Sequence, residues 1–219
     1  MKRDAVSGAA LIVGTVSGLV TMALHPSGHQ LMADYDRIAP LAVAVHVLAL
    51  AGMPITFLGA LGLTRRLSSE TATAALVAYG FATVAAMSAA VASGLIAPHV
   101  AGWTLQAAME DRGACRALLR YNGEINQAFA KVFVAASSVA ILLWSLAILA
   151  ARTFARAAGI LGCLIGALAL IGILSGSLRL DVHGFGLVVL AQGIWTLLVG
   201  VLLIRPAGVR STPLRASSG

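Results

Sequence analysis

Charged residues are scarce in this chain of 219 residues, because Asp, Glu, Lys and Arg together make up only 11% of it. A soluble domain has roughly a quarter of its residues charged. Hydrophobic residues make up 59% of the chain, and the few polar side chains could not cover so much apolar material. The composition therefore excludes an ordinary soluble domain and predicts an integral membrane protein surrounded by the lipid bilayer.

Several chemical signatures are also absent. The chain has two cysteines, too few for a disulfide framework. It contains no Walker loop, no dinucleotide-binding glycine fingerprint and no His-Glu-x-x-His motif, which argues against ATP-driven transport by this chain and against a standard zinc protease. A Gly-x-Ser-x-Gly hydrolase motif is missing as well. No motif names a catalytic residue, so the sequence leaves open whether the protein is an enzyme.

Long apolar runs predict six membrane-spanning helices. A span needs about 20 apolar residues, and none of the runs has the period-2 alternation of an outer-membrane barrel strand. Most connections are so short that consecutive helices must be antiparallel neighbours. We therefore expect an all-α, six-span up-down bundle that forms a single domain over residues 1–204. The predicted spans are residues 5–24, 39–63, 72–97, 126–151, 154–177 and 184–204.

Basic residues predict the orientation of this bundle. Nine Lys and Arg side chains gather at one set of span ends with two acidic residues, whereas the other ends carry six basic and six acidic residues. Because cytoplasmic loops are enriched in Lys and Arg, the first side should be cytoplasmic, with both termini inside a bacterial inner (plasma) membrane. Residues 205–219 should form a disordered basic tail there. The net charge of +7 then reports topology and requires no nucleic-acid partner.

Residues 98–125 form the one long connection, on the outer side. Trp103, Leu118 and Tyr121 make it apolar enough to lie in the membrane interface as one or two short helices, broken at Gly113. Structured outer loops often serve as lids, so we treat this segment as a candidate lid. The alternative is a surface segment that Trp103 and Tyr121 merely anchor.

Histidine is the polar residue whose placement is most informative. His46 lies within the second apolar run, roughly 10 Å from its outer end at about 1.5 Å per residue. Polar groups inside a bilayer are costly and usually turn toward the bundle interior. The sequence neighbours of His46 offer no partner, so the partner must come from another helix. All five histidines fall in the outer half of the predicted bundle; they are His25, His29, His46, His99 and His183.

Three of these histidines follow the same local pattern. Ser-Gly, aliphatic residues and then His end the segments at His25, His99 and His183. We therefore predict that these three rings and His46 form one outward-facing cluster. His29 is excluded, because a proline and a glycine precede it and favour a turned segment that stays solvated.

The predicted cluster suggests a metal or haem centre. Imidazole nitrogens from several helices suit Zn or Cu, and two facing rings suit the axial positions of haem. Such a centre would support redox or metal-dependent chemistry. Nearby polar residues could hydrogen-bond to the ligand rings and fix their tautomers; they are Glu124, Asn126, Asp181 and Lys131.

Two other classes of function stay open. The histidines could bind a proton or a solute in a small-solute or metal transporter, since ionisable groups in membranes often mark pathways. They could also only cap helix ends in a non-catalytic protein that assembles with a membrane complex or with further copies of itself.

The orientation can be tested with reporter fusions. Fusions after Arg66, Arg156 and Arg205 should report a cytoplasmic location, because the basic ends lie there. Fusions near Asp34 and Glu110 should report an external one. An external C-terminus would reverse the predicted sidedness of the histidines.

Overall fold

Helices form the whole framework of the protein. The computed structural model describes residues 2–26, 28–151 and 155–205, and within these ranges it contains helices and no strand. In chain order the helices are α1 (Lys2–Leu24), α2 (Gly28–Ala33), α3 (Tyr35–Leu67), α4 (Glu70–Val91), the π-helical turn η1 (Ala92–Ile96), α5 (Ala97–Gln106), α6 (Arg112–Ala151), α7 (Arg156–Leu174) and α8 (Val182–Ile204).

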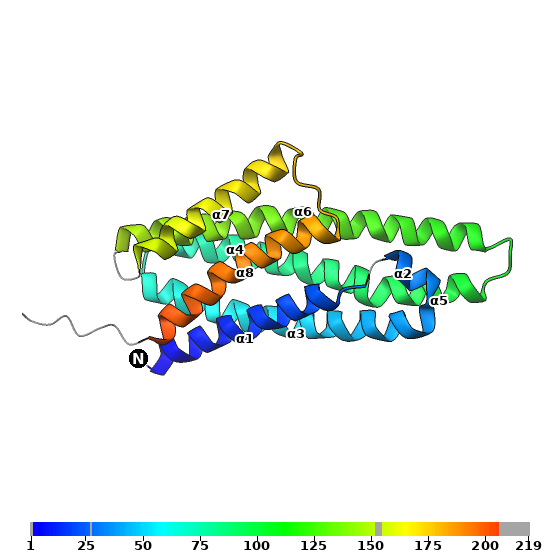
Figure 1. Ribbon diagram of the computed structural model, residues 1–219, viewed down its shortest axis with the longest axis horizontal. Coiled ribbons are helices and arrows are strands. Elements are labelled where there is room, and N and C mark those ends of the chain that lie inside the picture. The colour runs from blue at the N-terminus through cyan, green and yellow to red at the C-terminus, as the bar shows by residue number, and fades with distance from the viewer. Residues whose placement is uncertain (1, 27, 152–154, 206–219) are drawn as a thin grey trace, which may run out of the picture.

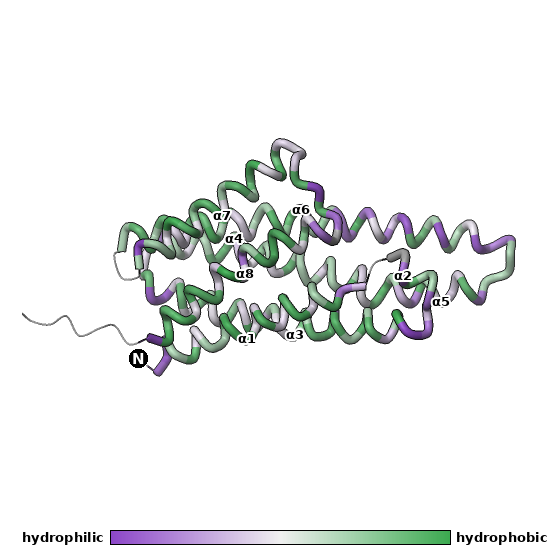
Figure 2. The backbone as a smooth tube through the Cα atoms, in the orientation of Figure 1, coloured by the Kyte–Doolittle hydropathy of each residue, from purple (hydrophilic) through white to green (hydrophobic). Residues whose placement is uncertain are grey.

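Six helical segments are long and apolar enough to cross a membrane, which confirms the all-α class and the six predicted spans. They are Lys2–Leu24, Tyr35–Leu67, Glu70–Gln106, Arg112–Ala151, Arg156–Leu174 and His183–Ile204. Hydrophobic residues dominate the middle of the bundle, and hydrophilic residues gather toward its ends (Figure 2). The cytoplasmic side of the termini stays a prediction. The predicted tail lies outside the described residues after Arg205.

Successive spans run in alternating directions along one bundle (Figure 1). The closest packing joins α1 with α3 and α4 with α6, as expected for consecutive helices. The last two spans differ from this pattern, because α7 packs mainly on α6 whereas α8 packs mainly on α1. As a result α1, α3, α4, α6 and α8 surround a common interior.

The spans that contain α3, α5 and α6 continue beyond the ends of α1 and α8 (Figure 1). At about 1.5 Å per residue, the 40 residues of α6 measure about 60 Å, twice a hydrocarbon core of about 30 Å. The extension has a small core of its own, where Leu31 of α2 and Ala101 of α5 pack with Ile38 and Ala39 of α3.

This extension corrects the expected conformation of residues 98–125. They form the rest of α5, a turn at 107–111 and the start of α6, so the chain reverses before Gly113. Gly113 is tolerated in the first turn of α6 because the residues after it, rich in Ala, Leu and Arg, are strong helix formers. A role of this segment as a lid stays a prediction.

Small residues let α1 approach α3 closely. A Cβ atom added at Gly14 would overlap the Thr56 hydroxyl and lie 2.7 Å from the Gly52 carbonyl oxygen. At Gly59 an added Cβ would lie 2.6 Å from the backbone nitrogen of Leu11. Close backbone approach provides the packing that association between helices in lipid requires.

Gly14→Ala should therefore destabilise the protein by about 1–3 kcal/mol, the usual cost of overpacking, because α1 must move away from α3. Thermal unfolding in detergent micelles measures the effect. Gly18→Ala, one turn further along α1, is the matched control, since nothing lies within 4 Å of the Cβ it adds. Equal unfolding temperatures for the two variants would contradict this account of the packing.

Candidate functional site

His46 is a buried histidine whose proton is fixed by the main chain. Its side chain is 3% exposed, and Nδ1 lies 2.6 Å from the carbonyl oxygen of Ala42. A carbonyl oxygen only accepts, so Nδ1 carries a hydrogen and donates it. In the neutral ring, Nε2 is then an unprotonated acceptor.

His25, directly after α1, meets this acceptor. The two Nε2 atoms are 3.1 Å apart, and the ring centroids are 4.8 Å apart with the planes at 67°. Two bare nitrogens would repel at this distance, so the neutral pair has the hydrogen of His25 on Nε2, which donates to His46. The Nδ1 atom of His25 is then unprotonated and buried, with no well-aligned hydrogen bond among the described residues, and the backbone of Pro26 lies next to the ring. Polar atoms left in this way are rare and call for an explanation.

Ser93 completes the polar contacts of His46. Its hydroxyl oxygen lies 2.9 Å from His46 Nε2 and 2.8 Å from the carbonyl oxygen of Ala89. The single hydroxyl hydrogen is shared between these two acceptors. His46 Nε2 is therefore enclosed by two donors, one from His25 and one from Ser93.

The π-helical turn η1 brings Ser93 to this position. Pro98 has no N–H group, and in a regular α-helix its ring would collide with the carbonyl group of Gly94. The wider π turn relieves this collision. It leaves the Ala92 carbonyl bonded to the N–H of Ala97, five residues later, and the side chain of Asn122 donates to the same carbonyl at 2.8 Å.

Gly94 makes room for the His46 ring. A Cβ atom at this position would overlap both Cβ and Cγ of His46. The residue after Ser93 must therefore lack a side chain if α3 and η1 are to approach so closely.

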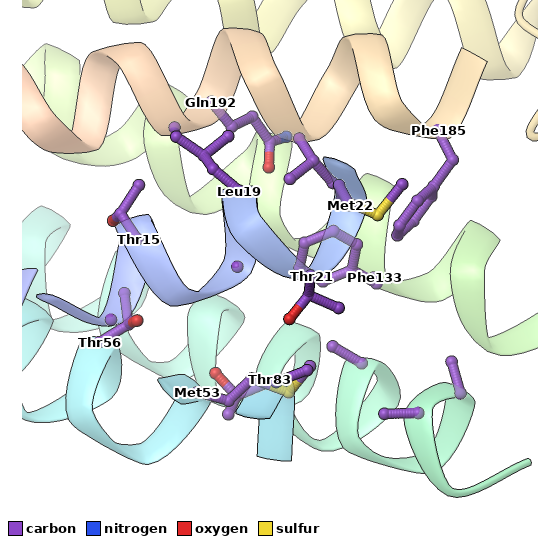
Figure 3. A pocket seen from close by; sticks show the side chains of 18 of the residues that line it. Thr15, Leu19, Thr21, Met22, Met53, Thr56, Thr83, Phe133, Phe185 and Gln192 are labelled. Atoms are coloured by element: carbon purple, nitrogen blue, oxygen red, sulfur yellow. The ribbon is translucent and has the colours of Figure 1, made fainter. Parts of the chain in front are cut away.

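A cavity of about 240 Å³ leads from the histidine pair into the centre of the bundle. Side chains of α1, α3, α4, α6 and α8 line it, and Figure 3 shows several of them, among them Thr21, Met22, Met53 and Phe133. Aromatic residues line it in several places: Tyr79, Phe133, Trp144, Phe185 and Trp195. Asp181, Asn126 and Gln127 also line the cavity.

Near the histidine pair, the hydroxyl donors of the wall are already used. Thr21 Oγ1 lies 2.9 Å from the Ser17 carbonyl oxygen and 3.0 Å from that of Val45. Ser93 donates to Ala89 or to His46. These hydroxyls consequently offer oxygen lone pairs and no free hydrogen.

The structure brings together two of the four histidines predicted to form one cluster. His25 and His46 are in contact, whereas His99 and His183 are exposed and do not line the cavity. The His99 ring lies against Trp103, with centroids 4.6 Å apart. Among the described residues, no three His, Cys, Asp or Glu side chains are placed to hold a metal ion. The side chain of His29 lies outside the described part.

Of the four residues expected to support the cluster, two line the cavity. They are Asn126 and Asp181, whereas Glu124 and Lys131 are exposed on α6 and do not line it. Asp181 is also the N-cap of α8, and its carboxylate accepts from the backbone N–H groups of Gly184 at 2.8 Å and His183 at 3.1 Å. The bond from Gly184 is the main reason why the pKa of Asp181 lies below its usual value.

The recurring Ser-Gly…His pattern marks a segment that does contribute to the site, but through its serine and glycine instead of its histidine. In the segment from Ser93 to His99, the serine contacts His46 and the following glycine makes room for its ring. In the segment that ends at His183, Gly176 has a positive φ of 70° and follows the end of α7. The three similar endings thus have different structural roles.

Comparison with known proteins gives no relative: no family model matches the chain, and neither the curated proteins nor the solved structures searched include a match. The functional argument therefore rests on the geometry of this chain.

Gly94→Ala should disrupt the contact between His46 and Ser93, because the added methyl group occupies the space of the His46 ring. We expect a loss of about 1–3 kcal/mol in thermal unfolding and a change in the nitrogen resonances of His46. Gly80→Ala on α4 is the matched control, since its Cβ would make an ordinary contact of 3.7 Å with Phe57. An unchanged His46 spectrum in Gly94→Ala would show that this packing is described incorrectly.

Proposed function

We propose that this protein binds an amphipathic small molecule within its membrane-spanning bundle. The observation that carries the proposal is the cavity of about 240 Å³ that joins an apolar, aromatic interior to the polar pair of His25 and His46. Ligand sites are typically concave and apolar with a few polar groups that fix orientation. The arrangement therefore fits a molecule with an apolar body and one polar group.

The chemistry of the wall narrows the class of ligand. Because Thr21 and Ser93 have committed their hydrogens and offer oxygen lone pairs, the polar group beside them should donate a hydrogen bond, as an amine N–H or a hydroxyl does. Aromatic side chains such as Phe133, Trp144 and Trp195 favour a planar ring in the body. The volume lies below the range of about 300–1,000 Å³ for drug-sized ligands, so the molecule should be small.

Metal or haem chemistry stays a second candidate, supported by the two imidazoles alone. Structural zinc usually has four protein ligands, and catalytic zinc usually has three. Here the two nitrogens are hydrogen-bonded to each other, and a metal ion would have to replace that bond. Metal analysis and an absorption spectrum of the purified protein distinguish this candidate from a lipophilic ligand. Carriage of the bound molecule across the membrane would be a transport function of the same cavity.

Gly18→Leu tests the ligand proposal directly. Gly18 lines the cavity, and nothing lies within 4 Å of a Cβ added there, so a leucine can fill the space without displacing α3. We expect the variant to fold and to lose at least tenfold in affinity for N-phenylnaphthylamine, a small aromatic amine with one N–H group. Energy transfer from tryptophan to the probe reports binding, since Trp144 and Trp195 line the cavity.

Gly123→Leu is the control for this experiment. It makes the same change on α6 at another open position, and Gly123 does not line the cavity. Its affinity for the probe should match that of the wild type. Equal energy transfer in wild type and Gly18→Leu would mean that the probe only partitions into lipid or detergent, and the proposal would fail.

A further inference from the structure

Gln192 is a buried polar side chain that lines the cavity from α8. It is 6% exposed, and its amide nitrogen donates to the hydroxyl oxygen of Ser138 on α6 at 3.0 Å. Its amide oxygen points from α8 into the cavity (Figure 3). The bond to Ser138 therefore fixes the amide group with its acceptor turned toward the space that a ligand would occupy.

The amide oxygen has no partner within the described part of the protein. The hydrogen bond to Ser138 is the one that the Gln192 side chain makes there. Two buried side-chain atoms of the described residues lack a partner, and they are His25 Nδ1 and Ser145 Oγ. Because Gln192 Oε1 is not one of them, it is accessible, and the cavity is the space that it faces. Its lone pairs are free to accept a hydrogen bond.

The side chains that pack beside this oxygen do not donate to it. On α1, Leu19 and Thr15 face this part of α8 with carbon atoms, since their Cδ2 and Cγ2 atoms lie 3.1 and 3.4 Å from a Cβ built at Gly193. The hydroxyl of Thr196, one turn further along α8, donates to the main-chain carbonyl of Gln192 at 2.8 Å. The amide oxygen is therefore left for a molecule inside the cavity.

This acceptor lies deeper in the bundle than the histidine pair. Leu19 faces Gly193 and lies six residues before His25, which corresponds to roughly 9 Å along a helix axis. The hydroxyl of Ser93 lies beside the histidine pair. Ser93 and Gln192 thus offer acceptors at two heights of the same cavity, whose wall is otherwise largely apolar.

We propose that Gln192 binds a second hydrogen-bond donor of the ligand, so that the preferred ligands have a donor on each side of an apolar body. This inference rests on the proposed function, which needs only the outer polar group, and it adds the inner one. A rigid pair of aromatic rings with a hydroxyl at each end has this shape. The test ligand is accordingly 4,4′-dihydroxybiphenyl.

Packing between helices is the other role open to Gln192, because polar side chains often join membrane helices through hydrogen bonds. That role uses only the amide nitrogen and Ser138. It gives no reason for an oxygen turned into open space, and it predicts no preference among ligands. A preference for a second donor therefore separates the two roles.

The test compares 4,4′-dihydroxybiphenyl with 4-hydroxybiphenyl, each in competition with N-phenylnaphthylamine for the full chain in lipid nanodiscs. Gln192→Met keeps the length of the side chain and removes the amide. It should weaken binding of the dihydroxy ligand about three- to tenfold, the contribution of one hydrogen bond between neutral groups. The monohydroxy ligand can place its hydroxyl at the outer acceptors, so its affinity should change less than about twofold. Comparing each ligand between two proteins cancels its solubility in lipid.

Gln106→Met is the matched control. It makes the same substitution at an exposed position of α5 that does not line the cavity. Both ligands should bind it with wild-type affinity.

The carbon resonance of the Gln192 side-chain carbonyl gives a second readout, which needs no variant of this residue to fold. In wild-type protein labelled at glutamine, the dihydroxy ligand should shift this resonance, because its inner hydroxyl donates to the oxygen. The monohydroxy ligand should shift it less. An unchanged resonance at saturation with the dihydroxy ligand would overturn the inference.

The affinities distinguish failure of this inference from failure of the proposed function. If both ligands displace the probe but Gln192→Met weakens them equally or not at all, the second donor site is wrong and the proposed function stands. If neither the probe nor the two ligands bind the wild type, both are wrong.

Discussion

The hydrogen bond from His46 Nδ1 to the carbonyl of Ala42 decides the chemistry of the interior. It is 2.6 Å long and lies inside α3, so the proton of this ring is fixed by the helix that carries it. Nε2 must then accept, which sets the hydrogen of His25 on its own Nε2 and leaves Nδ1 of His25 bare. A single main-chain contact thus determines the tautomers of both rings.

The same site depends on an irregularity of the backbone. Pro98 prevents a regular helix from continuing through Gly94, and the π turn that results places Ser93 against His46. Asn122 from α6 satisfies the Ala92 carbonyl within that turn, so the distortion is stabilised from a second helix. π turns of this kind are frequent at functional sites. Replacing this turn by a regular helix would break its contacts with both α3 and α6.

The sequence was sufficient for the helices and for two of the four histidines predicted to form one cluster, His25 and His46. Apolar length located all six spans, and the cost of a buried imidazole indicated correctly that His46 has its partner on another segment. The prediction for His99 and His183 assumed regular helices. Spacing along the chain does not show how each helix is rotated about its own axis. The π turn inserts a residue before His99 and rotates the rest of that helix by about 100°, and this ring ends against Trp103. Such rotations depend on packing partners that local sequence does not reveal.

An empty cavity of this size would destabilise the folded protein. At about 24 cal/mol per Å³, a fully enclosed dry cavity of about 240 Å³ would cost about 6 kcal/mol of the usual 5–15 kcal/mol of protein stability, and because this cavity is partly open that figure is an upper bound. Water can occupy the end near His25 and Ser93, where polar partners exist, but near Trp144 and Trp195 fewer polar groups are free, since both indole N–H groups donate to Thr64 and Ala158. A molecule with one polar end and an apolar body would satisfy both parts at once, and this match is the physical basis of the proposed function.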